Sequence, residues 1–284
     1  MIKIILIIFI GIHCKIRESS SPFISGDSFR NIATWIYDED RKDNFEKIGK
    51  NEIIFLKTDY LKDFFNNIHP QIKYPYILIT HNSDYGAPYK YEEYLDDPKI
   101  ICWFAQNPTT IHDKLIPIPI GIQNQYWEKG NLKFYQKFLK KNYKAIKNKE
   151  IFIYMNLADT HQERSAVKKI FIDQNYCKQV NCKPFEEYLI DLDNSVFVLS
   201  PRGNGLDCHR TWEVLLAGSI PVVKTSVLDK IYENLPVMIV KDWKNISIKD
   251  FNNYLTNLHT KKINLDKIYF EYWKELIYSK KLTN

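Results

Sequence analysis

The sequence lacks the features that mark several common protein classes. Its 284 residues include only nine glycines and five cysteines, and the cysteine spacing fits no zinc site. No segment carries an RNA-binding signature, no internal repeat is present, and no Gly-x-Ser-x-Gly or cysteine motif marks a hydrolase nucleophile. The longest apolar run, residues 4–12, is shorter than the about 20 residues that span a bilayer. These absences argue against zinc modules, RNA-binding modules, hydrolases and spanning helices.

The apolar run near the N-terminus predicts a signal peptide or a short membrane anchor over residues 1–17. Either would place the protein in the secretory lumen, in the periplasm or tethered to a membrane, and any membrane association would involve this segment. In a secreted chain Cys177 and Cys182 could close a small disulfide, and two reduced thiols are the alternative.

Composition predicts a globular protein of two domains. Hydrophobic residues make up 45% and charged residues 26% of the chain. The length suits two domains, which we place at residues 18–145 and 146–284. The net charge of +6 suits an anionic ligand. The densest basic run, residues 137–149, has no arginine and predicts a solvated linker or helix face, so no nucleic-acid partner is expected.

Short apolar runs alternate with amphipathic segments, which predicts an α/β fold. In the first half we expect a helix over Phe29–Tyr37 and strands over Phe23–Ser25, Glu52–Leu56, Tyr76–Thr80, Ile100–Phe104 and, as an edge or irregular strand because of its prolines, Leu115–Ile120. In the second half we expect strands over Ile151–Met155 and Val237–Val240, and helices over Phe185–Asp191, Val227–Tyr232 and much of Asp242–Thr283.

Residues 195–224 form the most informative segment. A buried strand, Val196–Leu199, leads into the turn Pro201–Gly205, a helix over Asp207–Ala217 and a second strand, Ile220–Val223. This is the β-loop-α-β unit of nucleotide-binding sheets, in which the helix N-terminus binds anions. The turn supplies Gly203, Asn204 and Gly205, and two arginines, Arg202 and Arg210, flank it. With Glu213 available for ribose hydroxyls, the pattern predicts a nucleotide diphosphate ligand.

The motif S-P-R-G-N-G-x-D-C-H-R-x-W-E-x(4)-G-x-I-P-V resembles the donor-binding signature of exostosin-like glycosyltransferases of the family-47 type. It is similar also to the C-terminal region of ribitol xylosyltransferases. The segments Gly26–Arg30, Thr80–Asp84 and Ile118–Ile122 resemble N-terminal blocks of small exostosin-like proteins. The resemblance implies a GT-B-like fold of two facing Rossmann-like domains with a C-terminal helical segment. It also implies a UDP-sugar donor on the second domain and an acceptor on the first.

Sugar transfer requires positive charge or hydrogen-bond donors at the departing diphosphate. Arg202, Arg210 and the Gly203–Gly205 amides are the first candidates. Arg164, which follows the loop after the Ile151–Met155 strand, is a further candidate. A structural pairing with a carboxylate is the alternative for each arginine. Asp207 either caps the helix or touches the ligand, and His209 either contacts the donor or packs. The D-x-D at Asp191–Asp193 falls at a helix end, so no metal and no cofactor are expected.

An inverting transferase also requires a base for the acceptor hydroxyl. Polar groups follow several strands of the first half, and of these Asp27, His81 and Asp84 qualify. The hypothesis is a metal-independent, inverting transfer to a glycan or other hydroxyl acceptor, with Asp84 or His81 as base. A non-catalytic nucleotide- or carbohydrate-binding protein is the alternative.

Overall fold

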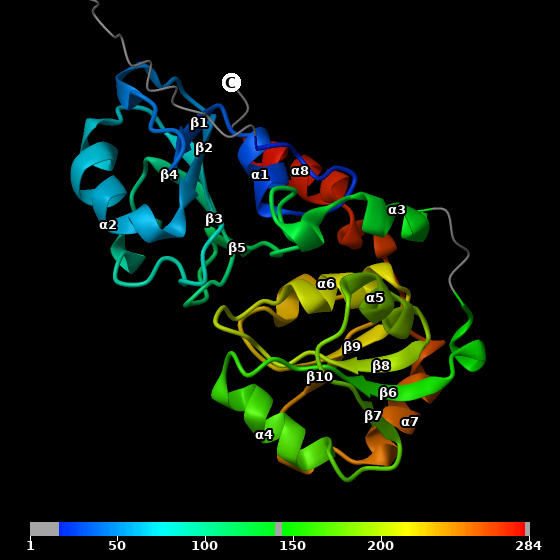
Figure 1. Ribbon diagram of the computed structural model, residues 1–284. Helices are drawn as coiled ribbons and strands as arrows, with labels where there is room; N and C mark the ends of the chain where they lie inside the picture. The colour runs from blue at the N-terminus through cyan, green and yellow to red at the C-terminus, as the bar shows by residue number, and fades with distance from the viewer. Residues whose placement is uncertain (1–16, 140–143, 282–284) are drawn as a thin grey trace, which may run out of the picture.

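Two parallel sheets of five strands each form the framework of the α/β fold, shown in Figure 1. The computed structural model describes residues 17–139 and 144–281. The predicted signal peptide or anchor therefore lies outside the described residues except for Arg17. No helix in the described ranges is both long and apolar enough to cross a membrane.

The first sheet has the strand order β1-β2-β3-β4-β5, and its strands are β1 (Trp35–Tyr37), β2 (Glu52–Lys57), β3 (Tyr76–His81), β4 (Ile100–Ala105) and β5 (Leu115–Pro117). All neighbouring strands are parallel. Every residue of β3 is buried, which explains why this strand reads as an unbroken apolar run. β5 lies at the edge of the sheet, as predicted, but it ends at Pro117, three residues before the predicted end at Ile120.

The second sheet has the order β10-β9-β8-β6-β7, and its strands are β6 (Ile151–Met155), β7 (Cys177–Gln179), β8 (Ser195–Leu199), β9 (Ile220–Lys224) and β10 (Met238–Val240). The strands predicted from apolar runs in this half are confirmed. From β6 the chain passes to the edge strand β7 and then returns across β6 to β8. The strand order therefore reverses between β6 and β8, and in open α/β sheets ligands bind at such a point.

The helices are α1 (Gly26–Asn31), α2 (Leu61–Asp63), α3 (Lys133–Leu139), α4 (Gln162–Phe171), α5 (Phe185–Asp193), α6 (His209–Leu216), α7 (Ile248–Leu258) and α8 (Phe270–Tyr278). Figure 1 shows α8 beside α1, near the first sheet, although α8 follows the second sheet in the chain. The rings of Phe270 and Phe29 lie 5.3 Å apart, and the Phe270 amide donates to the Pro22 carbonyl at 2.9 Å. The last helix thus packs on the first half of the chain.

The first elements differ from the prediction. Phe23–Ser25 forms no strand, because Ser25 caps a helix that begins at Gly26, and its hydroxyl accepts from the Ser28 amide. The predicted helix over Phe29–Tyr37 is wrong in its second half, where the residues of β1 pair with β2 instead. The predicted helix over Val227–Tyr232 is a 3-10 turn at Asp229–Tyr232.

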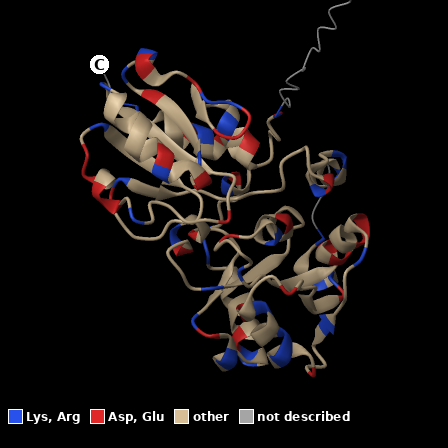
Figure 2. Cartoon of the chain, turned by 60° about the vertical axis from the view of Figure 1, so that its left-hand side comes forward, with Lys and Arg blue, Asp and Glu red and all other residues tan. Residues whose placement is uncertain are grey.

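The two halves share one apolar cluster. It contains Ile77 and Ile79 from β3 together with Trp212 and Leu215 from α6. Charged side chains of both signs are interspersed over both halves, as Figure 2 shows. The halves are therefore joined by a continuous core, and the site described next lies where they meet.

Candidate functional site

A cavity of about 490 Å³ lies at the reversal point of the second sheet. Its floor is formed by the loops that follow β6 and β8 and by the start of α6, with Asn156, Thr160 and Gly203 among the lining residues. The first half supplies the opposite wall with Asp84 and Lys129. The predicted β-loop-α-β unit therefore does border a cavity large enough for a small ligand.

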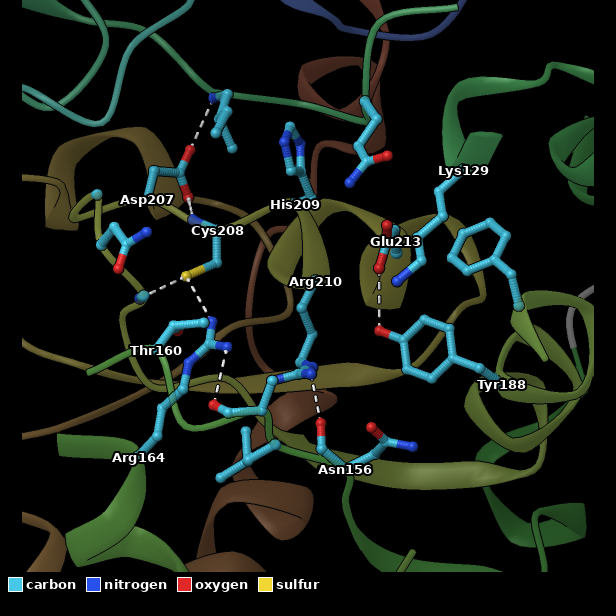
Figure 3. A pocket seen from close by; sticks show the side chains of 18 of the residues that line it. Lys129, Asn156, Thr160, Arg164, Tyr188, Asp207, Cys208, His209, Arg210 and Glu213 are labelled. Carbon is cyan, nitrogen blue, oxygen red and sulfur yellow. Dashed lines mark hydrogen bonds between the residues drawn. The ribbon is translucent and has the colours of Figure 1, made fainter. Parts of the chain in front are cut away.

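Arg210 lies in the middle of this cavity, between Arg164 on one side and Glu213 with Tyr188 on the other (Figure 3). Its Nη2 donates to the Asn156 carbonyl oxygen. Its Nε and Nη1 are buried and have no hydrogen-bond partner among the described residues. Buried charged donors without a partner are rare and costly, and these two are suited to hydrogen-bond an anionic ligand.

Arg164 and Arg202 donate hydrogen bonds to backbone carbonyls of the loops that border the cavity. Arg164 donates from Nε to the Arg202 carbonyl at 3.0 Å and from Nη1 to the Ala158 carbonyl at 3.4 Å. Arg202 folds back on its own turn, where Nη2 donates to the Asn204 carbonyl at 2.9 Å. Arg164 lines the cavity, whereas Arg202 is not among its lining residues. Of the expected pair of clamping arginines, Arg210 lines the cavity and Arg202 does not, while the further candidate Arg164 does.

The glycines of the turn allow other parts of the chain to pack closely against it. The Gly203 amide donates to Cys208 Sγ at 3.1 Å. A Cβ on Gly205 would lie 2.8 Å from Nδ2 of Asn107, which follows β4. Both glycines and Asn204 still line the cavity, so the turn lies against the first half and against the cavity at once.

Glu213 lies on α6 with its carboxylate at the far side of the cavity. It is only 5% exposed, and its Oε2 accepts from the Tyr188 hydroxyl at 2.9 Å. Burial and the neighbouring carboxylate raise the pKa of Tyr188 well above its ordinary value. Figure 3 shows Lys129 reaching towards the same carboxylate from the first half. This group of acceptor and donors is suited to hydroxyl-bearing ligands.

Asp207 holds the two halves together and does not cap α6, whose N-cap is Cys208. Its Oδ2 accepts from the Ile120 amide and from Trp212 Nε1, both at 2.8 Å. Its Oδ1 accepts from the Cys208 amide at 2.9 Å and from the Tyr232 hydroxyl at 3.2 Å. Burial raises the pKa of this carboxyl. Since four protein donors already bond to its two carboxylate oxygens, the role of Asp207 is to position the segments that form the cavity.

A second cavity, of about 240 Å³, adjoins the first at the carboxyl ends of β3 and β4. Asp84, Ile120 and His209 line both cavities. His209 donates from Nδ1 to the Gly121 carbonyl at 2.7 Å, which leaves the lone pair on Nε2. Asp84 is exposed and accepts from Asn204 Nδ2 at 3.3 Å. These two groups lie at the junction of the cavities.

The other proposed bases are more constrained. His81 is buried, with Nε2 bonded to the Pro119 carbonyl at 3.1 Å and Nδ1 accepting from the Asn82 amide at 2.7 Å. Burial lowers the pKa of His81 to about 4, so its ring is neutral near pH 7 with no free lone pair. Asp27 lies within α1, not at a strand end, and pairs with Arg17 at 2.8 Å. It lines neither cavity.

Several lining residues were not singled out from the sequence: Lys129, Lys183 and Tyr188. They come from α5 and from the segments beside it, which carry no motif. Asn107 was visible only as part of a polar cluster after a strand. Its Oδ1 accepts from the Asp207 amide at 2.9 Å. Such clusters predict where strands end, but not which side chain bridges the two halves.

The cysteines and the D-x-D segment have ordinary surroundings. Cys177 and Cys182 are free thiols. Asp191 and Asp193 fall in the last turn of α5, and Asp191 pairs with Lys183 at 2.6 Å. Among residues 17–139 and 144–281, no group of three His, Cys, Asp or Glu residues is placed to hold a metal ion.

Comparison with known families places more than half of the chain in one of them. The family model described as the RXYLT1 C-terminal domain matches residues 119–278. The matched segment contains the whole second sheet, the Pro201–Gly205 turn and α6. No curated protein matches the chain.

Proposed function

The chain belongs to the RXYLT1 C-terminal domain family, and from this premise we propose that it is a glycosyltransferase. The family relation links it to the C-terminal region of ribitol xylosyltransferases. We propose that it moves a sugar from a nucleotide-sugar to the hydroxyl of a glycan or another acceptor. Exostosin-like kinship and a GT-B arrangement of domains 18–145 and 146–284 are part of the same proposal.

The observation that carries this proposal is the pair of unpartnered donors on Arg210. They are buried in a cavity at the point of the sheet where nucleotides bind in related folds. A diphosphate would satisfy both donors and would place its charge near Arg164, Lys129 and Lys183, which also line the cavity. Glu213 would accept hydrogen bonds from the ribose hydroxyls. The resemblance to exostosin-like enzymes favours uridine as the nucleoside.

The transfer would take place at the junction of the two cavities. The acceptor oxygen attacks the anomeric carbon, the bond from that carbon to the β-phosphate oxygen breaks, and the nucleoside diphosphate leaves with the bonding electrons. Arg210 stabilises its negative charge, so the reaction needs no bound metal. The acceptor proton passes to a base, and attack opposite the leaving group inverts the anomeric centre.

His209 is the better placed base. Its Nδ1–H bond to Gly121 fixes the tautomer in which Nε2 can accept a proton, and its ring lines both cavities. Asp84 lines both cavities too and is the alternative. His81 is less suited because both of its ring nitrogens are already hydrogen-bonded.

Calorimetric titration of the full chain with UDP in the presence of EDTA tests the donor site. We expect binding that R210M weakens by about 100-fold, the value of two charge-assisted hydrogen bonds. R210M should lower the melting temperature only slightly, because of the three side-chain nitrogens that it removes only Nη2, bonded to the Asn156 carbonyl, has a partner among the described residues. The control is R41M, which removes an exposed arginine whose side chain bonds, among the described residues, to Asp43 and to the Thr34 carbonyl.

Failure of the folded wild type to bind UDP, GDP or their sugar derivatives would refute the donor site. Binding that appears only after Mg²⁺ or Mn²⁺ is added would refute metal independence. Tight nucleotide binding with no turnover of any sugar nucleotide, in the presence or absence of acceptors, would favour the non-catalytic binding protein.

A further inference from the structure

The second cavity differs in chemistry from the first. Four of the residues that line the first cavity are cationic: Lys129, Arg164, Lys183 and Arg210. Within the part of the chain that the structure describes, no lysine or arginine lines the second cavity. Its polar lining is dominated by amide and hydroxyl side chains, namely Asn82, Ser83, Gln106 and Asn124. Such a lining is suited to a neutral ligand rich in hydroxyl groups.

Gln106 indicates that this cavity is built for a ligand. The residue follows β4 and is only 2% exposed, yet its Oε1 accepts no hydrogen bond from any described residue. A buried acceptor without a donor is unfavourable unless a bound molecule supplies one. Its position in the cavity lining means that a ligand hydroxyl can reach it.

Two aromatic side chains line the same cavity. Trp127 is 58% exposed and Tyr126 is 37% exposed, and their ring centroids lie 5.3 Å apart. Large exposed aromatic rings beside convergent amides offer an apolar face and polar edges together. Sugar rings combine the same two properties, with C–H groups on one face and hydroxyls at the rim.

We propose that the second cavity is an acceptor subsite that binds one neutral pyranose ring, stacked on Trp127 and hydrogen-bonded to Gln106. The volume of about 240 Å³ is below the roughly 300–1,000 Å³ of drug-sized sites, which suits a single ring. The shared lining residues Asp84 and His209 place a hydroxyl of that ring at the junction with the first cavity. This inference rests on the proposed function and specifies the acceptor as a neutral glycan.

Saturation-transfer NMR on the full chain tests the subsite. The probes are methyl glycosides of glucose, galactose, xylose and N-acetylglucosamine, and disaccharides of these sugars, with UDP present. We expect at least one probe to bind, W127A to weaken that binding by about tenfold and W127F to restore part of it. Tyr74→Ala is the control, because Tyr74 is 52% exposed and lies just before the amino end of β3, whereas the second cavity lies at the carboxyl end of that strand.

Gln106→Met distinguishes a ligand contact of Gln106 from a purely structural role. Replacing an unsatisfied buried amide by an apolar side chain of similar size should keep or raise the melting temperature, while binding of the probe weakens. A loss of probe binding in a protein of unchanged stability supports a ligand contact. A fall in stability with unchanged probe binding refutes it.

UDP titration of the same samples distinguishes failure of the acceptor subsite from failure of the donor site. If UDP binds and no neutral saccharide does, the acceptor subsite is refuted and the donor site stands. If saccharides bind equally well to wild type and W127A, or only acidic saccharides added to the panel bind, the subsite is also refuted. If saccharides bind as expected and neither UDP, GDP nor their sugar derivatives bind, the second cavity stands as a saccharide site, but its role as an acceptor subsite falls with the transferase proposal.

Discussion

At the scale of single residues, the side chains of the motif divide into two groups with different tasks. Arg210 and Glu213 present their polar atoms to the cavity. Asp207 and Arg202 form hydrogen bonds to protein groups instead. All four belong to residue types that bind nucleotides, so the motif alone could not separate them. Whether a motif side chain is free to bind a ligand depends on its protein partners, and these partners, such as the Ile120 amide bonded to Asp207, are distant in sequence.

His209→Gln is expected to lower kcat by about 100-fold or more while leaving the affinity for UDP unchanged. Glutamine can keep a hydrogen bond to the Gly121 carbonyl but cannot take up a proton, and general bases contribute about 10²–10⁴-fold. Steady-state kinetics with the sugar nucleotide identified by calorimetry provide the measurement.

Asp84→Asn is the matched comparison, and we expect a smaller loss of kcat. A reversal of the two effects would assign the base to Asp84 and leave His209 as a positioning residue. Equal, small effects would refute both assignments.

At the scale of elements, strands were easier to predict than the short helices. Fully buried parallel strands such as β3 and β8 read as apolar runs, and no tertiary information was needed to find them. The start of α1 depends on the cap at Ser25, and β1 exists because β2 lies beside it. The basic run that predicts a solvated linker or helix face includes Lys149, yet Lys149 is buried and its Nζ donates to the Asp193 carbonyl at 2.8 Å.

Gly121→Ala is expected to lower the free energy of unfolding by about 2–4 kcal/mol. Gly121 follows β5 with φ +67°, and a Cβ there would lie 2.1 Å from the Ile24 carbonyl oxygen. Since the clash is with backbone, no rotamer change relieves it. Guanidinium denaturation of the variant and the wild type gives the difference.

Gly49→Ala is the control for the loss of glycine itself. A Cβ at Gly49 would meet no atom closer than 3.4 Å, the distance to Glu52 Oε1. If Gly121→Ala were as stable as Gly49→Ala, the connection after β5 would not require glycine.

At the scale of the whole molecule, the Pro201–Gly205 turn and the start of α6 are part of the contact between the two halves. Asp207 bonds to Ile120, His209 to Gly121, and Gly205 lies against Asn107. The cavity wall from the first half is fixed by the same contacts. The proposed ligand binding at the motif would therefore be coupled to the relative placement of the halves through shared residues.

Asp207→Asn is expected to lower the free energy of unfolding by about 2–4 kcal/mol. An amide nitrogen in place of one carboxylate oxygen would face donors only, either from Ile120 and Trp212 or from Cys208 and Tyr232. Chemical denaturation measures the loss, and hydrogen exchange at the Ile120 amide reports whether the contact between the halves opens.

The comparison is Asp159→Asn, which removes a surface carboxylate paired with Lys168 at 2.7 Å. Exposed pairs of this kind are screened by solvent and contribute little to stability. Equal stability of the two variants would show that Asp207 does not hold the halves together.

The sequence by itself determined the α/β class, most strands of both sheets and the position of the motif that we propose binds a nucleotide. Those features depend on local patterns: apolar runs, turn residues and the spacing within one β-loop-α-β unit. Only the tertiary structure decided which motif side chains are free, that His209 and Asp84 lie between two cavities, and that α8 returns to α1. Each of these depends on contacts between residues far apart in the chain, and the periodicity of a single segment carries no information about its distant partners.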